Sequence, residues 1–132
     1  MKKKLKPTKA YFGIYNDVFK YETLFSFGET DQQLISKLKR FIPAEELIIG
    51  WGSDSCQGYC RMFECGVLLV RMRNLPLTCE DYGILAHEIF HSVEISLARK
   101  GIEFNNNMIN ESLAYSIEHT TKNCYKKLNK YF

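Results

Sequence analysis

The sequence predicts an α+β domain in which a small, mostly antiparallel β-sheet packs against two helices near the C-terminus. Three observations lead to this fold class. Alternating aromatic residues and apolar runs that indicate strands are concentrated before residue 75, with one capped helical segment among them. Two longer segments with helical periodicity follow, at about residues 79–100 and 108–127. Strands followed by helices, rather than alternating with them, are typical of α+β folds.

Length, composition and charge indicate one globular domain over residues 1–132, with residues 1–8 as a basic N-terminal tail. The 132-residue chain is 45% hydrophobic and 14% aromatic, and its formal net charge is only +3. Much of the positive charge lies at the two ends of the chain, which we interpret as solvated segments. We therefore expect neither nucleic acid nor a membrane as a partner.

Targeting signals and cysteine content indicate the compartment. The N-terminal lysines are not followed by the apolar run of a signal peptide, and the stretches "LIIGW" and "GVLLV" are too short to cross a bilayer. Five cysteines, an odd number, fit a reducing compartment. Cys56, Cys60 and Cys65 lack the C-x-x-C spacing of a zinc knuckle, so we expect free thiols. These observations predict a cytoplasmic protein.

The first half of the chain supplies the strands. "AYFGIYNDVFKYETLFSFG" predicts two strands with a turn near Asn16. Thr30 and Gln33 predict a capping box at the start of a helix. "ELIIGW" predicts a further strand, and "YCRMFECGVLLVRMRN" predicts one or two strands that bend near Gly66. The residues expected to share one face of the second strand are Phe19, Tyr21, Thr23, Phe25 and Phe27.

The helix at residues 79–100 has signals at both ends. Thr78 with Asp81 forms a second capping box, and Gly101 follows two basic residues as a C-terminal stop. One side of this helix should pack on the sheet. The residues of the expected apolar stripe are Tyr82, Ala86, Ile89, Phe90, Val93 and Leu97.

The other side of the same helix carries "HEIFH" within "LAHEIFHSVE". His87 and His91 lie about 40° apart around the helix axis and one turn from each other, so both imidazoles can bind one zinc ion. Glu88 lies about 100° from His87 and flanks the metal position. There it can accept a proton from a zinc-bound water and pass it to a leaving amine. Motifs of this length also arise by chance, but this one falls in a capped helix and uses two of the chain's three histidines.

A catalytic zinc site needs a third protein ligand and leaves its fourth position to water. Glu94 lies on the motif helix, where a surface charge or a hydrogen bond to a ligating histidine is the better role. Glu111 comes early in the last helix, after a gap long enough for the chain to turn back, although a carboxylate there can also simply complement the helix dipole. Glu118 lies about 10 Å further along that helix, so it and Glu111 cannot both reach the ion. The full set of candidates after the motif is Glu94, Glu103, Glu111, Glu118 and His119.

"HEIFH" followed by "INESLAY" resembles the gluzincin branch of zinc metallopeptidases, in which a later helix supplies a glutamate ligand, often within N-E-x-x-A. The resemblance implies a zincin-like fold and one zinc ion (Zn2+) per chain. Over residues 66–120, the order of strand, proline-bearing loop and motif helix also resembles small metallopeptidases encoded by bacteriophages and prophages, which implies a host cytoplasm. The matching positions are His87, His91 and Glu111 as metal ligands, Glu88 as catalytic base, and Asn110 and Ala114 as flanking residues.

The chain also departs from the gluzincin pattern. Some gluzincins place an acidic residue four positions after the glutamate ligand, and this chain has Tyr115 there. Tyr115 and His119 are the candidates for a donor that stabilises the transition state. Without a second domain to build a deep cleft, we expect a shallow site in which a peptide pairs with the edge of the strand at residues 67–73.

Three functions are compatible with these residues. The favoured one is a zinc-dependent metallopeptidase that hydrolyses a peptide or protein substrate, with Glu88 as general base. The second is a zinc-stabilised, non-catalytic binding or regulatory protein that acts on a host or viral partner. In that case a further side chain, such as His119 or a cysteine, would close the fourth coordination position. The third is a metal-free interaction domain in which the motif arose by chance.

Overall fold

The structure is a computed structural model that describes residues 8–102 and 110–132. Glu103, the predicted start of the last helix at about residue 108 and most of the basic tail lie outside the described residues. The chain forms one α+β domain, as the sequence predicts. In chain order its elements are β1 (Ala10–Asn16), β2 (Tyr21–Phe27), α1 (Asp31–Leu38), a 3-10 turn (Ala44–Glu46), β3 (Gly58–Met62), β4 (Leu68–Met72), α2 (Cys79–Arg99), α3 (Asn110–Leu128) and a second 3-10 turn (Asn129–Tyr131).

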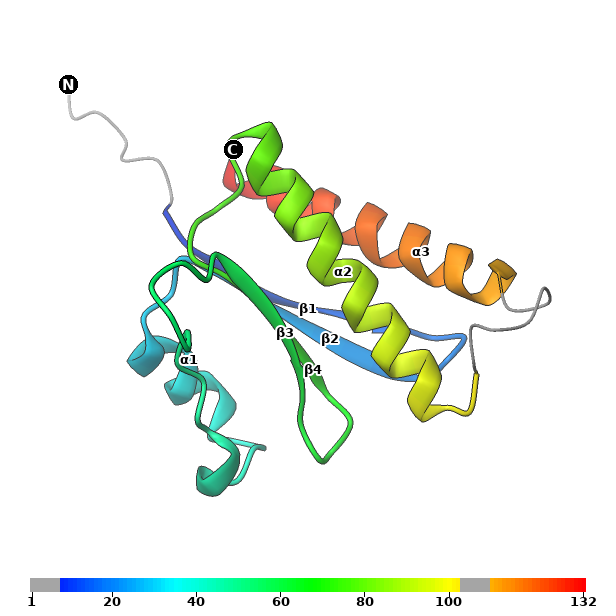
Figure 1. The fold of residues 1–132 in the computed structure, drawn as a ribbon, viewed down its shortest axis with the longest axis horizontal. Coiled ribbons are helices and arrows are strands. Elements are labelled where there is room, and N and C mark those ends of the chain that lie inside the picture. The colour runs from blue at the N-terminus through cyan, green and yellow to red at the C-terminus, as the bar shows by residue number, and fades with distance from the viewer. Residues whose placement is uncertain (1–7, 103–109) are drawn as a thin grey trace.

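The four strands form one mixed sheet in the order β1-β2-β4-β3 (Figure 1). Strands β1 and β2 pair antiparallel, as do β3 and β4, whereas β2 and β4 pair parallel. The sheet is therefore mostly antiparallel, as predicted. The strand at residues 67–73, however, is not an edge, because β4 has hydrogen-bonded neighbours on both sides. The edge on that side of the sheet is β3.

Helices cover both faces of the sheet, with α2 and α3 on one face and α1 on the other (Figure 1). The period-two pattern of β2 sends Phe25 and Phe27 into the core beneath α2 and α3, whereas Leu24 packs with Leu34 beneath α1. The predicted face of β2 is thus confirmed, except that Phe19 lies in the turn before the strand. Full burial of each such side chain contributes about 1.5–3 kcal/mol to stability.

Helix α1 begins as predicted. The Thr30 side chain accepts a hydrogen bond from the Gln33 backbone N–H (3.1 Å), and the Gln33 side chain accepts one from the Thr30 N–H (3.0 Å). These two bonds satisfy donors that the first helical turn leaves unpaired.

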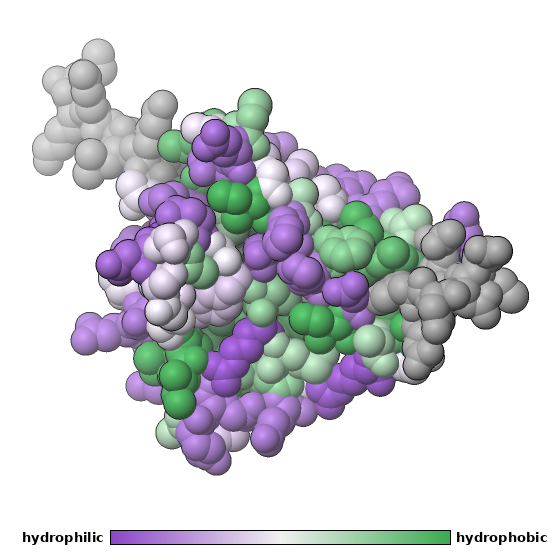
Figure 2. All heavy atoms as spheres, in the orientation of Figure 1, coloured by the Kyte–Doolittle hydropathy of each residue, from purple (hydrophilic) through white to green (hydrophobic). Residues whose placement is uncertain are grey.

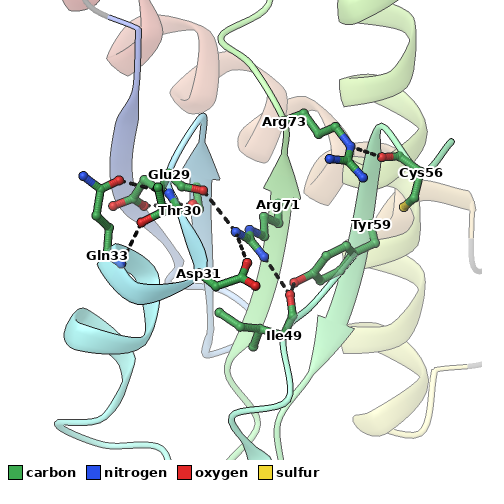
Figure 3. A network of polar contacts seen from close by, with 10 residues as sticks. Glu29, Thr30, Asp31, Gln33, Ile49, Cys56, Tyr59, Arg71 and Arg73 are labelled. Atoms are coloured by element: carbon green, nitrogen blue, oxygen red, sulfur yellow. Dashed lines mark hydrogen bonds and ion pairs between the residues drawn. The ribbon is translucent and has the colours of Figure 1, made fainter. Parts of the chain in front are cut away.

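The segment "ELIIGW" does not form the predicted strand; a 3-10 turn and an irregular stretch replace it. Its carbonyl groups bond side chains instead of a neighbouring strand. The Ile49 carbonyl accepts hydrogen bonds from Tyr59 Oη and Arg71 Nη1, both at 2.6 Å (Figure 3). Ile48 is 81% exposed, whereas Ile49 is buried. The apolar run alone could not distinguish this loop from a strand.

Arg71 organises the side of the sheet that α1 covers (Figure 3). Its side chain is 1% exposed and pairs with Asp31 at 2.7 Å. It also donates a hydrogen bond to the Glu29 carbonyl at 3.0 Å, and its guanidinium lies 4.4 Å from the centre of the Trp51 ring. These contacts compensate the buried charge and give both terminal nitrogen atoms of the guanidinium a partner, whereas the buried Nε of Arg71 has none within the described residues. The network links the start of α1, β4 and the loop after the 3-10 turn.

The two edges of the sheet differ in what lies beside them. On β1, Lys127 Nζ of α3 donates to the Gly13 carbonyl (2.8 Å), and the His119 ring bonds the Tyr15 carbonyl through Nε2 (3.1 Å). Side chains that occupy edge carbonyls protect a strand against further pairing. Within the described residues, no strand pairs with the outer edge of β3. The open edge of the sheet is therefore the one at β3.

All five cysteines are free thiols in this structure. None of the helices among residues 8–102 and 110–132 has the length and apolar character needed to cross a membrane.

Candidate metal centre

Helix α2 has both predicted end signals. The Thr78 side chain accepts a hydrogen bond from the Asp81 N–H (3.1 Å), and the Asp81 carboxylate accepts bonds from the backbone N–H groups of Leu77 (3.0 Å) and Thr78 (3.2 Å). The bonds from Leu77 and Thr78 favour the ionised form and hold the pKa of Asp81 below its usual value of 3.8. At the other end, Gly101 adopts a φ of 81°, which favours glycine.

The buried face of α2 differs from the predicted apolar stripe. Ala86 is exposed and Phe90 is 39% exposed, so the prediction that both face the core is wrong. The buried face is rotated by about 60° toward Glu88, Ser92 and Ser96. Serine side chains are small, and the Ser92 hydroxyl donates to the Ile89 carbonyl at 2.7 Å, which satisfies it within the helix. The buried residues of α2 are Leu85, Glu88, Ile89, Ser92, Val93, Ser96 and Leu97.

The two motif histidines meet on the outer side of α2. Their Nε2 atoms are 3.0 Å apart, and their ring planes are inclined by 81°. The side chain of His87 is 66% exposed and that of His91 is 41% exposed. Without a metal, one ring can donate its Nε2–H to the lone pair of the other. Around a tetrahedral zinc ion, two nitrogen ligands lie roughly 3.3 Å apart. The pair therefore fits as two ligands of one ion after only a small adjustment.

Glu88 points into the domain beside this pair. The residue is 7% exposed, and its Oε1 lies 3.9 Å from His87 Nε2. Burial raises the pKa of Glu88 above its usual value of 4.5, and the two histidines partly offset that increase. A carboxylate with a raised pKa is a stronger proton acceptor near neutral pH. Glu88 is thus a buried carboxylate with a raised pKa beside the histidine pair, and its role as general base stays a prediction.

Cys60 of β3 faces the same region, which the sequence did not predict. Burial raises the pKa of its thiol to about 12, and the negative charge of Glu88 contributes to the increase. No spacing rule connects a residue of β3 with the motif helix. Only the strand pairing, which places Cys60 opposite Val70, brings it beneath α2.

Glu94 lies one turn after His91 on the same helix. Its Oε1 is 3.4 Å from His91 Nδ1. If Nδ1 carries the ring proton and donates it to this carboxylate, the Nε2 lone pair is left to bind a metal. The contact agrees with one of the two roles predicted for Glu94.

The third predicted ligand does not join the pair in this structure. Glu111 is exposed in the first turn of α3. Within the described ranges 8–102 and 110–132, no three His, Cys, Asp or Glu side chains lie close enough to hold a metal ion together. Of the three predicted ligands, the structure brings together His87 and His91, and Glu111 would have to approach them to complete the set.

Among the described residues, the other candidates on α3 form no metal-binding group with the histidine pair. His119 bonds the Tyr15 carbonyl, and the ring of Tyr115 stacks on it at 5.9 Å between centroids. Glu118 and Ala114 are exposed. His119 and Tyr115, the two candidates for a transition-state donor, therefore contact each other, and His119 also contacts β1.

In comparisons with known proteins, the chain matches no protein-family model, no curated protein and no solved structure.

Proposed function

We propose that this protein is a zinc-dependent metallopeptidase whose site is built on His87, Glu88 and His91. The observation that carries the proposal is the 3.0 Å separation of the two Nε2 atoms beside a buried carboxylate with a raised pKa. His87 and His91, with Glu111 as the third ligand, would hold the ion. Zinc bound there would supply a Lewis acid that polarises the scissile carbonyl and lowers the pKa of a water molecule.

In this proposal Glu88 transfers a proton from the attacking water to the leaving group. Its carboxylate accepts a proton from the attacking water and then donates it to the nitrogen of the leaving amine. With only 10% of its side chain exposed, Glu88 exchanges that proton with bulk water less readily than an exposed carboxylate. Because burial disfavours the charged form, the protonated intermediate is less costly here than at the surface.

Strand β3 orients the substrate in this proposal. It is an edge strand and packs against α2, which carries the motif. An extended peptide can add to such an edge through main-chain hydrogen bonds. The opposite edge at β1 is occupied by His119 and Lys127. The edge proposed for substrate is therefore β3, in place of the strand at residues 67–73.

The alternative is a zinc-stabilised binding or regulatory protein without catalysis. A structural zinc site normally has four protein ligands. Among the residues that the structure describes, two histidines converge at the motif. The two functions therefore differ in whether the remaining coordination positions are taken by water and substrate or by further side chains, and peptide cleavage distinguishes them.

The test is hydrolysis of a mixed peptide library by zinc-supplemented protein, with cleavage products identified by mass spectrometry. Glu88→Gln should keep bound zinc but cleave about 10²-fold more slowly, because a positioned general base is lost. Glu111→Ala should weaken zinc binding. Glu80→Gln, an exposed position in the first turn of α2, is the matched control and should cleave normally. A wild-type protein that holds zinc and cleaves nothing would favour the binding protein instead.

A further inference from the structure

A cavity of about 230 Å³ lies at the C-terminal end of α2. In Figure 1 this end of the helix, drawn in yellow, lies between the β1–β2 turn and the β3–β4 turn. Ser96, which borders the cavity, is about 7.5 Å along the helix axis from His91 and about 140° around it. The cavity therefore opens on a different side of α2 from the histidine pair. The residues that matter for its chemistry are Lys20, Glu22, Cys65, Ser96, Arg99 and Lys100.

Positively charged side chains outnumber negatively charged ones around the cavity. Lys20, Arg99 and Lys100 contribute three positive charges and Glu22 one negative charge, which leaves a net charge of +2 (3 − 1). None of these four side chains takes part in an ion pair within the described part of the chain. Cations gathered around a cavity without carboxylate partners favour the entry of an anion.

Arg99 is held in place by neutral groups. Its Nη2 donates to the Glu64 carbonyl at 3.1 Å, and its Nη1 lies 3.4 Å from Met62 Sδ. These contacts fix the guanidinium against the β3–β4 turn without neutralising it. A pre-positioned guanidinium with N–H groups left over is suited to bind an oxyanion.

Ser96 has a hydroxyl without a partner. The residue is 2% exposed, and its Oγ forms no hydrogen bond with the described residues. Buried hydroxyl groups in native proteins nearly always have a partner. Because Ser96 borders the cavity, an oxygen atom of a bound ligand could supply one after rotation of the side chain.

Lys20 has an unfavourable backbone conformation. Its φ is 59°, and within residues 8–102 and 110–132 every other residue with positive φ is glycine. The Lys20 N–H donates to the Asn16 carbonyl at 2.8 Å, which closes the β1–β2 turn. Glycine is less strained in such a position than any residue with a side chain. The strained position nevertheless holds a lysine, and this lysine lines the cavity.

We propose that this cavity binds the phosphate group of a small ligand. A phosphate group carries a charge of about −1.5 to −2 near neutral pH, which matches the lining better than the single charge of a carboxylate. Lys20 and Lys100 would donate to its oxygen atoms, and Arg99 would do so through its fork of N–H groups. The proposal goes beyond the peptidase function and does not depend on it.

The test is a titration of 15N-labelled full-length protein with inorganic phosphate at constant ionic strength, followed by NMR. Signals from the two turns and the end of α2 should shift in a saturable way. Lys20→Gly should weaken binding by about tenfold or more, since a charge-assisted hydrogen bond is lost, while thermal stability stays equal or rises. Lys100→Gln should weaken binding as well. Lys126→Gln, an exposed position on α3, is the charge-matched control and should bind as the wild type does.

The rate at which cysteines are alkylated gives a second, independent measurement of phosphate binding, with an internal control. Phosphate should slow alkylation of Cys65, which lines the cavity, by iodoacetamide, and should not slow alkylation of the exposed Cys79. The proposal is overturned if sodium chloride at equal ionic strength reproduces the shifts, or if Lys20→Gly binds phosphate as tightly as the wild type. Equal affinity for acetate would overturn the assignment to phosphate.

Discussion

His87 and His91 bring their Nε2 atoms to within 3.0 Å of each other on the exposed side of α2. Glu88, which directly follows His87, is buried instead. Helical geometry explains the division, because residues four apart share a face and the next residue is rotated by about 100°. One turn of helix thus presents two potential metal ligands to solvent and keeps a carboxylate inside.

The contact between Glu94 and His91 predicts an effect on metal affinity. Glu94→Gln removes a carboxylate that can accept the Nδ1 proton of His91, so zinc affinity should fall by about tenfold or more, with the fold intact. A competition titration with a chromophoric chelator measures this effect. Glu118→Gln, exposed on α3, should bind zinc like the wild type. If Glu94→Gln and the wild type bind zinc with equal affinity, Glu94 does not support metal binding by His91.

The burial of Glu88 predicts a pH-dependent stability. Folding raises the pKa of Glu88 above 4.5, so the metal-free wild type should lose stability as the pH rises through the folded-state pKa. Glu88→Gln removes the charge and should raise the free energy of unfolding at pH 7. Below pH 4.5 the two proteins should converge, since Glu88 is then protonated in both states. Urea unfolding with a chelator present, at pH 7 and pH 4, measures the difference; a less stable variant at pH 7 would contradict it.

The buried Arg71 predicts a contrast with Arg73, because both guanidinium groups lie against the Trp51 ring. Arg71→Met should lower the free energy of unfolding by about 2–4 kcal/mol, because the Glu29 and Ile49 carbonyls lose their donor. Arg73 also lies against the Trp51 ring, at 4.5 Å, but is partly exposed. Arg73→Met should therefore cost about 1 kcal/mol or less. Urea unfolding of both variants measures the costs, and equal costs would mean that the Arg71 network adds nothing specific.

The parts of the fold that follow from local signals could be predicted from the sequence. The capping boxes at Thr30 and Thr78 and the stop at Gly101 depend on residues close together in the chain, and the structure has all three. The juxtaposition of His87 and His91 is local in the same sense. A helix repeats every 3.6 residues whatever surrounds it.

What could not be predicted depends on contacts between distant segments. The carbonyl of Ile49 bonds Arg71 Nη1, 22 residues away, so a run that looks like a strand becomes a loop. The exposure of Phe90 depends on how α2 packs on the sheet, which hydrophobic periodicity does not specify. The position of Glu111 relative to the histidines likewise depends on how α3 is placed beside α2. The resemblance of "NESLA" to N-E-x-x-A predicts that Glu111 approaches the histidines, but it does not supply the distance.

The most direct test of the central claim is the zinc content of protein purified without a histidine tag. We predict about one zinc ion per chain after supply of the metal and dialysis, measured by mass spectrometry of the element. His91→Ala should lose most of this zinc, whereas His119→Ala should retain it, because His119 bonds the Tyr15 carbonyl rather than the ion. A wild-type protein that binds no zinc, or a His119→Ala variant that loses as much as His91→Ala, would contradict the account.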